Sequence, residues 1–251
     1  MNGVKTYIAF GDVHYEDKFL DMLYPLISDM KPDNIVIAGD FADFQIISDF
    51  DKHERRFIGK SDTAKKIMKE IDWANAKFDY IDKISPKSRK AFIKGNHEVR
   101  FDKFCRYEEV QFNEGSRLIE NQFRIRDRKW DFVDLGGRYK IGKCYFLHGE
   151  RIGGENPAKI AALKFRKNVR LWHHHTNQSF MITSPLDSKD CFEAKSIGCL
   201  CEKDPIYLRG LTNRWANSFL VGYVYPNGNF QDFVVNIIDD KYVAPNGKIY
   251  A

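Results

Sequence analysis

Short apolar runs recur along the first two thirds of the chain, and longer stretches of mixed polarity separate them. Each run is rich in β-branched and aromatic side chains. This composition over so few residues is typical of buried strands. The predicted strands occupy residues 4–10, 34–38, 91–93, 144–147 and 169–172.

The stretches between these strands carry apolar residues three or four positions apart, which is the spacing of an amphipathic helix. Residues 17–30 predict one such helix, although Pro25 is expected to kink or shorten it. The charged segment 51–90 predicts a long helix after Ser61 that covers one face of the sheet. Asn156 and Pro157 predict the start of a further helix, which runs through Lys167.

Beyond Phe180 the pattern changes to closely spaced β-rich runs, and Pro-Asn-Gly at 226–228 and 245–247 predicts tight turns. Strands that alternate with helices indicate a parallel arrangement, whereas strands joined by tight turns indicate an antiparallel one. We therefore predict an α/β fold: a layered αββα sandwich whose mixed sheet has a parallel N-terminal part and antiparallel C-terminal strands.

A single domain over residues 1–251 is expected, with the helical segment 51–90 and the β-rich part 180–251, because no linker or low-complexity tract interrupts the chain. The composition allows a full core, since 43% of the residues are hydrophobic. No apolar stretch approaches the roughly 20 residues of a membrane span. Five cysteines, odd in number and not spaced as a disulfide framework, predict a reducing, cytoplasmic location. Cys199 and Cys201 are expected to be alternate residues of one strand.

Candidate chemistry lies directly after the predicted strands. Six of the seven histidines form four short clusters there, and carboxylates and an amide occupy the same kind of position. These residues are Asp12 and His14, Asp40 and Asp43, Asn96, His97 and Glu98, His148, and His173 to His175. In α/β sheets, ligands bind beyond the carboxyl ends of the strands, so we expect these side chains to lie together.

The types of side chain indicate a metal centre. Imidazole, carboxylate and amide ligands suit Mn, Fe, Zn or Ni, whereas paired thiolates would have indicated structural zinc. These side chains are too many for one ion, but two ions that share one carboxylate could use seven of them as ligands. Such two-metal sites hold phosphoryl groups during in-line attack.

The motifs also resemble a known family. Asp12-x-His14, Gly39-Asp40-x-x-Asp43, Gly95-Asn96-His97-Glu98, His148-Gly149 and the final triple histidine are similar, in this order, to the five sequence blocks of the calcineurin-like metallophosphoesterases. Together they span residues 10–176, about two thirds of the chain. GNHEVR and the tail Gly-Cys-Leu-Cys-x-x-x-Pro-x-Tyr, with Trp215 downstream, resemble the bacteriophage-encoded branch, which would act in a bacterial or phage-infected cell.

The resemblance implies a ligand for each position. Asp12, His14 and His175 would bind the first divalent ion, Asn96, His148 and His173 the second, and Asp40 would bridge the two. Mn is the favoured metal, with Fe, Zn or Ni as alternatives. A metal-bridging hydroxide would attack the phosphorus, and His97, supported by Glu98 or Asp43, would donate a proton to the leaving oxygen.

Three positions leave alternatives open. The usual Gly-His-x-His of the family is Trp172-His173-His174-His175 here, so the ligand pair is either His173 with His175 or His175 with Asn177. Trp172 itself is either core or a stacking face for a base. Arg100 could bind a substrate phosphate, or could form a surface ion pair with Asp102 or Glu98.

The function indicated is hydrolysis of a phosphate monoester or diester. The phosphorylated substrate could be a nucleotide, a nucleic acid or a phosphoprotein. The alternative is a catalytically inactive scaffold that keeps the fold and binds a partner, which the intact motif residues disfavour. A nucleic-acid-binding module with structural zinc fits less well, because the candidate ligands are His, Asp and Asn.

Overall fold

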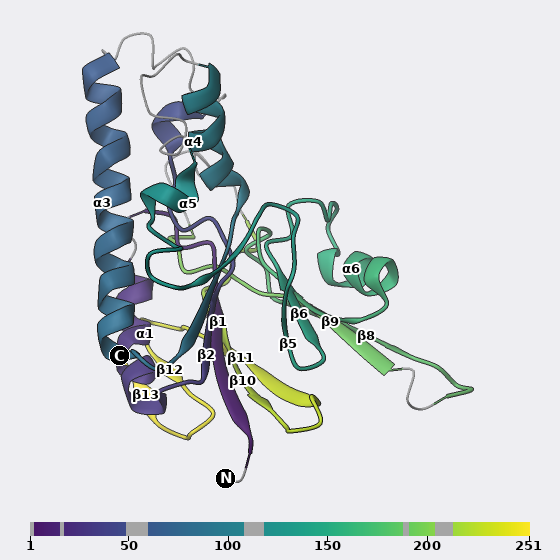
Figure 1. Ribbon diagram of the computed structural model, residues 1–251. Coiled ribbons are helices and arrows are strands. Elements are labelled where there is room, and N and C mark those ends of the chain that lie inside the picture. Colours follow the sequence, from purple (N-terminus) through teal and green to yellow (C-terminus); the bar gives the residue numbers. More distant parts are fainter. Residues whose placement is uncertain (1–2, 16–17, 49–59, 108–117, 188–190, 204–212) are drawn as a thin grey trace.

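The computed structural model describes residues 3–15, 18–48, 60–107, 118–187, 191–203 and 213–251. Two β-sheets pack face to face, and helices lie on their outer faces (Figure 1). The first sheet has the strand order β11 (Phe230–Asn236), β10 (Ser218–Val224), β1 (Lys5–Phe10), β2 (Asn34–Ile37), β3 (Arg89–Ile93) and β4 (Asp131–Val133). The second has the order β5 (Tyr139–Ile141), β6 (Cys144–Leu147), β7 (Asn168–Leu171), β9 (Cys191–Ser196) and β8 (Gln178–Thr183).

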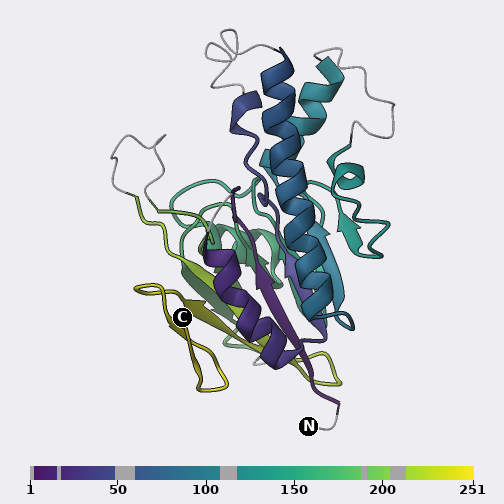
Figure 2. The same cartoon turned by 90° about the vertical axis from the view of Figure 1, so that its left-hand side faces the viewer.

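Three hydrophobic clusters define the layers. The helices α1 (Phe19–Met30) and α3 (Lys60–Ile84) pack on the outer face of the first sheet, as the view in Figure 2 also shows. A second cluster, which includes Tyr7, Phe146 and Trp172, fills the space between the sheets. The helix α6 (Pro157–Phe165) covers the outer face of the second sheet. The predicted αββα sandwich is therefore confirmed.

The helical spacing predicted the buried face of α3 correctly. All five apolar positions on which the prediction depended are buried against the first sheet: Ile67, Ile71, Ala74, Phe78 and Ile81. The first part of the predicted helical segment, residues 51–59, lies outside the described residues.

The helix α1 differs from the prediction at Pro25. It continues without interruption from Phe19 to Met30, with Pro25 on the solvent-exposed side. The opposite side buries Leu23, Leu26 and Ile27, and this packing holds the helix together across the proline.

The C-terminal strands extend both sheets. β10 pairs antiparallel with β1 and extends the first sheet, whereas β9 pairs parallel with β7 and extends the second. The predicted tight turns are present, and each Pro-Asn-Gly ends in a glycine with positive φ, Gly228 or Gly247. Gly247 lies between β12 (Tyr242–Val243) and β13 (Ile249–Tyr250), which pair with each other.

The five predicted strands are also divided between the two sheets. β1, β2 and β3 are parallel neighbours in the first sheet, and β6 and β7 are parallel neighbours in the second. The ends of the sheets are joined where the candidate ligands lie, because His148, after β6, hydrogen-bonds the carbonyl of Ala38, after β2 (Nδ1 to O, 2.8 Å). Two further helices, α4 (Asn96–Tyr107) and α5 (Ile119–Gln122), were not predicted. Among the described residues, no helix is long and apolar enough to cross a membrane.

Candidate metal centre

The loops after β1 and β2 form one side of the site. Their backbones are joined by two hydrogen bonds, from the Asp12 amide to the Gly39 carbonyl and from the His14 amide to the Asp40 carbonyl, both 3.0 Å. Asp12, His14 and Asp40 all have positive φ, at 51°, 47° and 48°. Left-handed backbone costs roughly 1–3 kcal/mol per non-glycine residue and clusters at functional sites.

His173 and His175, after β7, share this backbone conformation, with φ of 75° and 57°. The backbone amide of His173 donates to Oδ2 of Asp12 at 2.7 Å, which fixes the loop of the second sheet to the loop of the first. Five of the seven predicted metal ligands therefore adopt a left-handed conformation, and all five lie in the loops that follow β1, β2 and β7.

The side chains of the first predicted ligand set meet at one point. His14 and His175 approach with their Nε2 atoms 3.3 Å apart, and His175 Nε2 lies 3.6 Å from Oδ2 of Asp12. Asp12, His14 and Asp40 also form a group whose ligand atoms are all close enough to hold one ion.

The second predicted set meets beside it. His148 directs Nε2 at Oδ1 of Asn96, 2.9 Å away, and at Oδ2 of Asp40, 3.2 Å away. Its Nδ1–H donates to the Ala38 carbonyl, which leaves Nε2 as the ligand atom. Asp40, His148 and His173 form a second group with suitable ligand atoms, so Asp40 belongs to both groups.

One buried carboxylate oxygen in the site receives no hydrogen bond from the described residues, although Nδ1 of His148 lies 3.8 Å from it. Asp12 is completely buried, and no hydrogen-bond donor among the described residues reaches its Oδ1. An unsatisfied buried acceptor costs about 1–3 kcal/mol, and a divalent cation would compensate that cost. Burial raises the pKa of Asp12 to about 7, against the opposing effect of His148. The donor set and this oxygen both fit a bound cation.

Burial and neighbouring charges lower the pKa of some histidines of the site and raise the pKa of others. Burial lowers the pKa of His173 to about 4, with help from His148, and burial lowers the pKa of His175 well below its usual value. Both imidazoles are therefore neutral at pH 7, the form that binds metal. For His148, burial lowers the pKa, but Asp40 and Asp12 more than compensate and raise it to about 10.

The last histidine block offers either His173 or Asn177 as the ligand beside His175, and these two side chains have different surroundings. The side chain of Asn177 accepts from the Gly198 amide and the Ser218 hydroxyl, both at 2.7 Å, and donates to Asn236 at 2.6 Å. These bonds join the loop after β9 to β10 and β11, and they occupy the amide. The geometry therefore favours His173 with His175 as the ligand pair.

His97 lies at the edge of the two ligand groups and is held by Asp43. Its Nδ1 is 2.8 Å from Oδ1 of Asp43, and its backbone amide donates to Oδ1 of Asp40 at 2.8 Å. Burial opposes protonation of the ring, but Asp40 and Asp43 raise the pKa of His97 above its ordinary value. Arg100 donates to Nε2 of His97 at 3.0 Å and to the Asp43 carbonyl at 2.9 Å, so it faces the site and does not pair with Asp102 or Glu98.

Of the two alternatives for the support of His97, the contacts favour Asp43, because the hydrogen bonds of the Glu98 carboxylate go to backbone amides. This carboxylate is completely buried and accepts four backbone amides, from Asp40, Phe41, Ala42 and Gly95, at 2.7–3.2 Å. Glu98 therefore fixes the loop that carries Asp40, while Asp43 supports His97.

Three residues of the site were not identified from the sequence. Glu70 of α3 accepts the amides of Asp43 and Phe44, at 2.9 and 2.7 Å, and its place among the apolar positions of α3 was the available signal. Cys201 lies 3.8 Å from Nδ1 of His175 and is not part of a strand, contrary to expectation. Trp215 packs edge-on against the His175 ring, with centroids 4.1 Å apart.

Trp172 is core and offers no stacking face. It is completely buried in the cluster between the sheets, and its ring lies 3.0 Å from the position of a β-carbon on Gly11. The glycine that the family carries at this position is replaced by a side chain that packs away from the ligands. Of the predicted tail motif, residues 204–212 lie outside the described residues.

Gly95 provides a sharp test of how closely the site is packed. A β-carbon there would lie 2.1 Å from Oδ1 and 2.4 Å from the amide nitrogen of Asp40. Gly95→Ala is therefore expected to displace Asp40, to lower the free energy of unfolding by about 1–3 kcal/mol and to weaken metal binding. Urea titration and metal-binding isotherms would measure both effects.

Gly153→Ala is the matched control, because a β-carbon at Gly153 meets nothing within 4 Å. Its free energy of unfolding should stay within about 0.5 kcal/mol of the unmodified protein. Equal behaviour of the two variants would contradict the close approach at Gly95.

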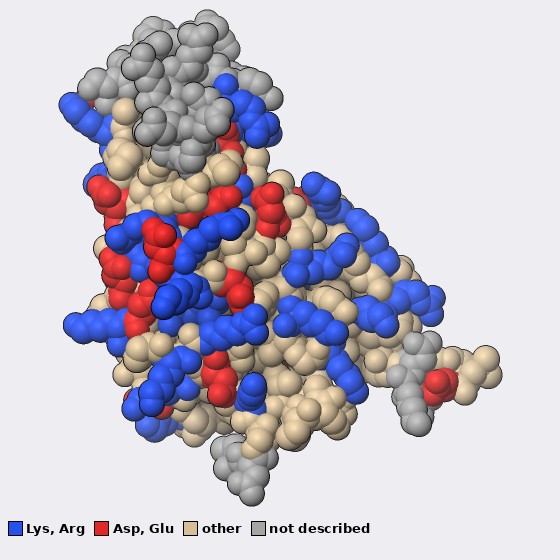
Figure 3. All heavy atoms as spheres, in the orientation of Figure 1, with Lys and Arg blue, Asp and Glu red and all other residues tan. Residues whose placement is uncertain are grey.

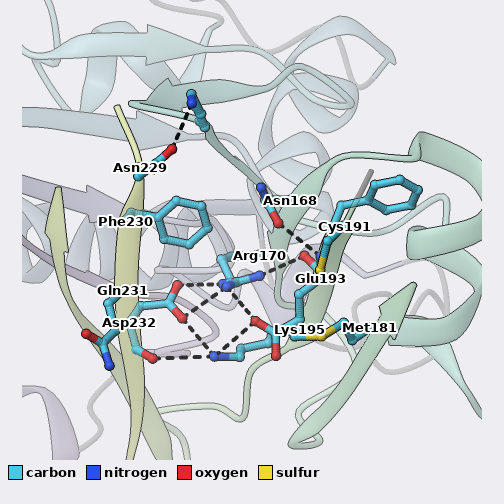
Figure 4. Close-up of a pocket in the computed structure, with 12 residues that line it drawn as sticks. Asn168, Arg170, Met181, Cys191, Glu193, Lys195, Asn229, Phe230, Gln231 and Asp232 are labelled. Atoms are coloured by element: carbon cyan, nitrogen blue, oxygen red, sulfur yellow. Dashed lines mark hydrogen bonds and ion pairs between the residues drawn. The ribbon is translucent and has the colours of Figure 1, made fainter. Parts of the chain in front are cut away.

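A cavity of about 420 Å³ lies at the opposite end of the second sheet (Figure 4). Asn168, the first residue of β7, lines it, whereas the histidine block follows the last residue of β7. On its floor, Arg170 binds Asp232 and Glu193, and Lys195 also binds Asp232. These charges satisfy one another, which indicates a structural network and no catalytic site.

One family model and several solved structures are similar to the chain. Residues 5–209 match the sequence model of the calcineurin-like phosphoesterases. Similar solved structures include an archaeal phosphodiesterase, with 12% identity, a TM-score of 0.43, and coverage of 91% of this chain and 99% of that one. Another is YfcE, a phosphoesterase from E. coli, with 12% identity, a TM-score of 0.40, and coverage of 92% and 100%.

A third is a dimetal phosphatase from Danio rerio, with 10% identity, a TM-score of 0.39, and coverage of 94% and 99%. A search of curated protein sequences finds no match. At these identities and TM-scores, the assignment rests on the match to the sequence model.

Proposed function

Because the chain belongs to the calcineurin-like phosphoesterase family, we propose that it is a dinuclear metal-dependent phosphoesterase that hydrolyses a phosphate monoester or diester. The observation that carries the proposal is the meeting of two ligand groups at Asp40, one with Asp12 and His14 and one with His148 and His173. The buried Oδ1 of Asp12, which no described donor reaches, adds support.

In this proposal, Asp12, His14 and His175 hold one ion, Asn96, His148 and His173 hold the other, and Asp40 contacts both. Bound divalent ions would lower the pKa of a water molecule and neutralise phosphate oxygens. Mn is the favoured metal, and Fe, Zn or Ni are alternatives, because these ligands suit all four.

His97 would donate a proton to the leaving oxygen. Asp40 and Asp43 raise the pKa of its ring, which favours the protonated form, and the 2.8 Å contact with Asp43 fixes its orientation. Proton donation by a positioned histidine contributes roughly 10²–10⁴-fold to a rate.

Arg100 would bind the substrate phosphate. In its present position it donates to Nε2 of His97, so that nitrogen accepts a hydrogen bond and cannot act as an acid. The positive charge of Arg100 also lowers the pKa of His97. Movement of the guanidinium to an incoming phosphate would free Nε2 and raise the pKa of His97 together, which couples substrate binding to acid catalysis.

The test is hydrolysis of p-nitrophenyl phosphate and bis-p-nitrophenyl phosphate by protein that has been chelated and then supplied with Mn²⁺, Fe²⁺, Zn²⁺ or Ni²⁺. We expect turnover that chelator abolishes and metal restores. The ratio of the two rates would distinguish a phosphatase from a phosphodiesterase or nuclease.

Binding of two ions per chain without turnover on either ester would instead favour the scaffold alternative. Membership of the bacteriophage-encoded branch and a cytoplasmic location remain predictions from the sequence.

A further inference from the structure

The positive charge of the chain is concentrated in one layer of the fold. Between positions 138 and 167 there are eight Lys and Arg residues and only two acidic residues, Glu150 and Glu155. The net charge of the whole chain is +5, so the rest of the sequence is close to neutral. The eight cations are Arg138, Lys140, Lys143, Arg151, Lys159, Lys164, Arg166 and Lys167, and all are exposed.

These cations belong to β5, to α6 and to the loops beside them, which together form the outer side of the second sheet. In the space-filling view, Lys and Arg gather over this part of the molecule with few acidic groups between them (Figure 3). We call this region the basic surface, and its central cations are Arg138, Lys140, Arg151, Lys159 and Lys164.

Aromatic rings support the basic surface from below. Arg138 lies 5.1 Å from the centroid of the Phe165 ring, and Lys164 lies over the same ring at 5.7 Å. Lys140 lies 5.2 Å from the centroid of Tyr145. Rings at these distances attract the cations and orient their side chains over the outer face.

The loop from His148 to α6 connects the candidate metal centre to the basic surface. His148 begins the loop that leads to α6, and Arg151 follows three residues later. The Arg151 guanidinium lies against Gly136, in the loop before β5, about 3.1 Å from the position of a β-carbon there. Near α6, the Glu155 carbonyl accepts a hydrogen bond from Gln178, which begins β8 just after the histidine block.

We infer that the basic surface binds the sugar-phosphate backbone of a nucleic-acid strand and leads it to the metal centre. This inference rests on the proposed function and names the class of its substrate, a polynucleotide. Exposed cations along a path contact successive phosphates, and the release of counterions then supplies most of the affinity.

The contacts favour a nucleic acid over an anionic membrane. Peripheral membrane binding needs aromatic or aliphatic side chains that insert between lipids. Here the rings of Phe165 and Tyr145 lie beneath cations. A path of charge that ends at a phosphoesterase centre also matches a polymer whose linkages are phosphodiesters. Leu163, 57% exposed, and Ile160, 37% exposed, are the side chains of α6 that a lipid partner would use, so vesicles belong in the test.

The test compares the unmodified protein with the triple variant Lys140→Gln, Lys159→Gln, Lys164→Gln. Fluorescence anisotropy would measure binding of a labelled single strand of about 20 nucleotides across a salt series, with strand integrity checked on a gel. Each lost phosphate contact should reduce the logarithmic salt slope by about 0.7, so the variant should lose roughly two from its slope. Hydrolysis of p-nitrophenyl phosphate should not change, because these lysines do not contact the metal centre.

The control variant removes equal charge from the other helical layer and its following turn: Lys66→Gln, Lys83→Gln, Lys87→Gln. It should bind the strand as the unmodified protein does, and an uncharged methylphosphonate strand should bind to none of the three proteins. Equal losses in the two triple variants would overturn the inference. So would charge-dependent binding to phosphatidylserine vesicles without binding to the strand. If the protein bound the strand through the basic surface but turned over no ester, the proposed function would be refuted. The inferred binding of nucleic acid by the basic surface would still hold.

Discussion

Asp40→Asn is expected to lose bound divalent metal and phosphoesterase turnover together, with kcat/KM lower by at least about three orders of magnitude. Asp40 belongs to both ligand groups, so the change removes negative charge from both at once. Asparagine keeps the volume and can still accept the His97 amide that now reaches Oδ1 at 2.8 Å. The fold should therefore survive. Metal content after dialysis and kcat/KM with p-nitrophenyl phosphate would measure the two losses.

Asp239→Asn is a matched control for this substitution. Asp239 is exposed and has φ of 50°, close to the 48° of Asp40, so the same chemical change is made in the same backbone conformation away from the site. Metal content and turnover should be unchanged. If Asp40→Asn kept two ions per chain and full turnover, Asp40 would not be a shared ligand.

The positions of the candidate ligands could be predicted from the sequence because strand ends are visible in it. Apolar runs of a few residues followed by His, Asp or Asn mark the carboxyl ends of strands, and these ends do meet in the structure. Local patterns do not show which strands share a sheet. β2 and β6 look alike in sequence, yet they lie in different sheets.

The sequence of β10 indicates a strand in the interior of a sheet. Six of its seven residues, from Ser218 to Val224, are buried, and the run SFLVGYV has no alternation of apolar and polar residues. A strand of that kind is buried on both faces and belongs inside a sheet. The pattern agrees with the position of β10 between β1 and β11, although it does not identify these neighbours.

The carboxylate that supports His97 is not the one nearest to it in sequence. Asn96 begins α4, so Glu98 turns away from His97 by the rotation of a helix and reaches the amides of the loop after β2. Asp43, far from His97 in sequence, is brought to it by the pairing of β2 with β3. Such a choice depends on tertiary structure alone.

His97→Ala is expected to keep both ions but to lose turnover, by about 10²–10⁴-fold for an alkyl phosphate. No predicted metal ligand is removed, so metal content should match that of the unmodified protein. The loss should be much smaller for p-nitrophenyl phosphate, because its phenolate leaves without needing a proton. A loss that is equal for both esters, or a loss of metal, would point to a structural role for His97.

The pH profile provides a second measurement of the same role. An acid must be protonated, so kcat for the alkyl ester should fall as the pH rises through the pKa of His97, which Asp40 and Asp43 raise above the ordinary histidine value against the effect of burial. His97→Ala should lack this alkaline fall. Asp43→Asn removes one of the two charges that raise the pKa, so it should move the fall to lower pH. A profile that is unchanged in both variants would assign the proton to another group.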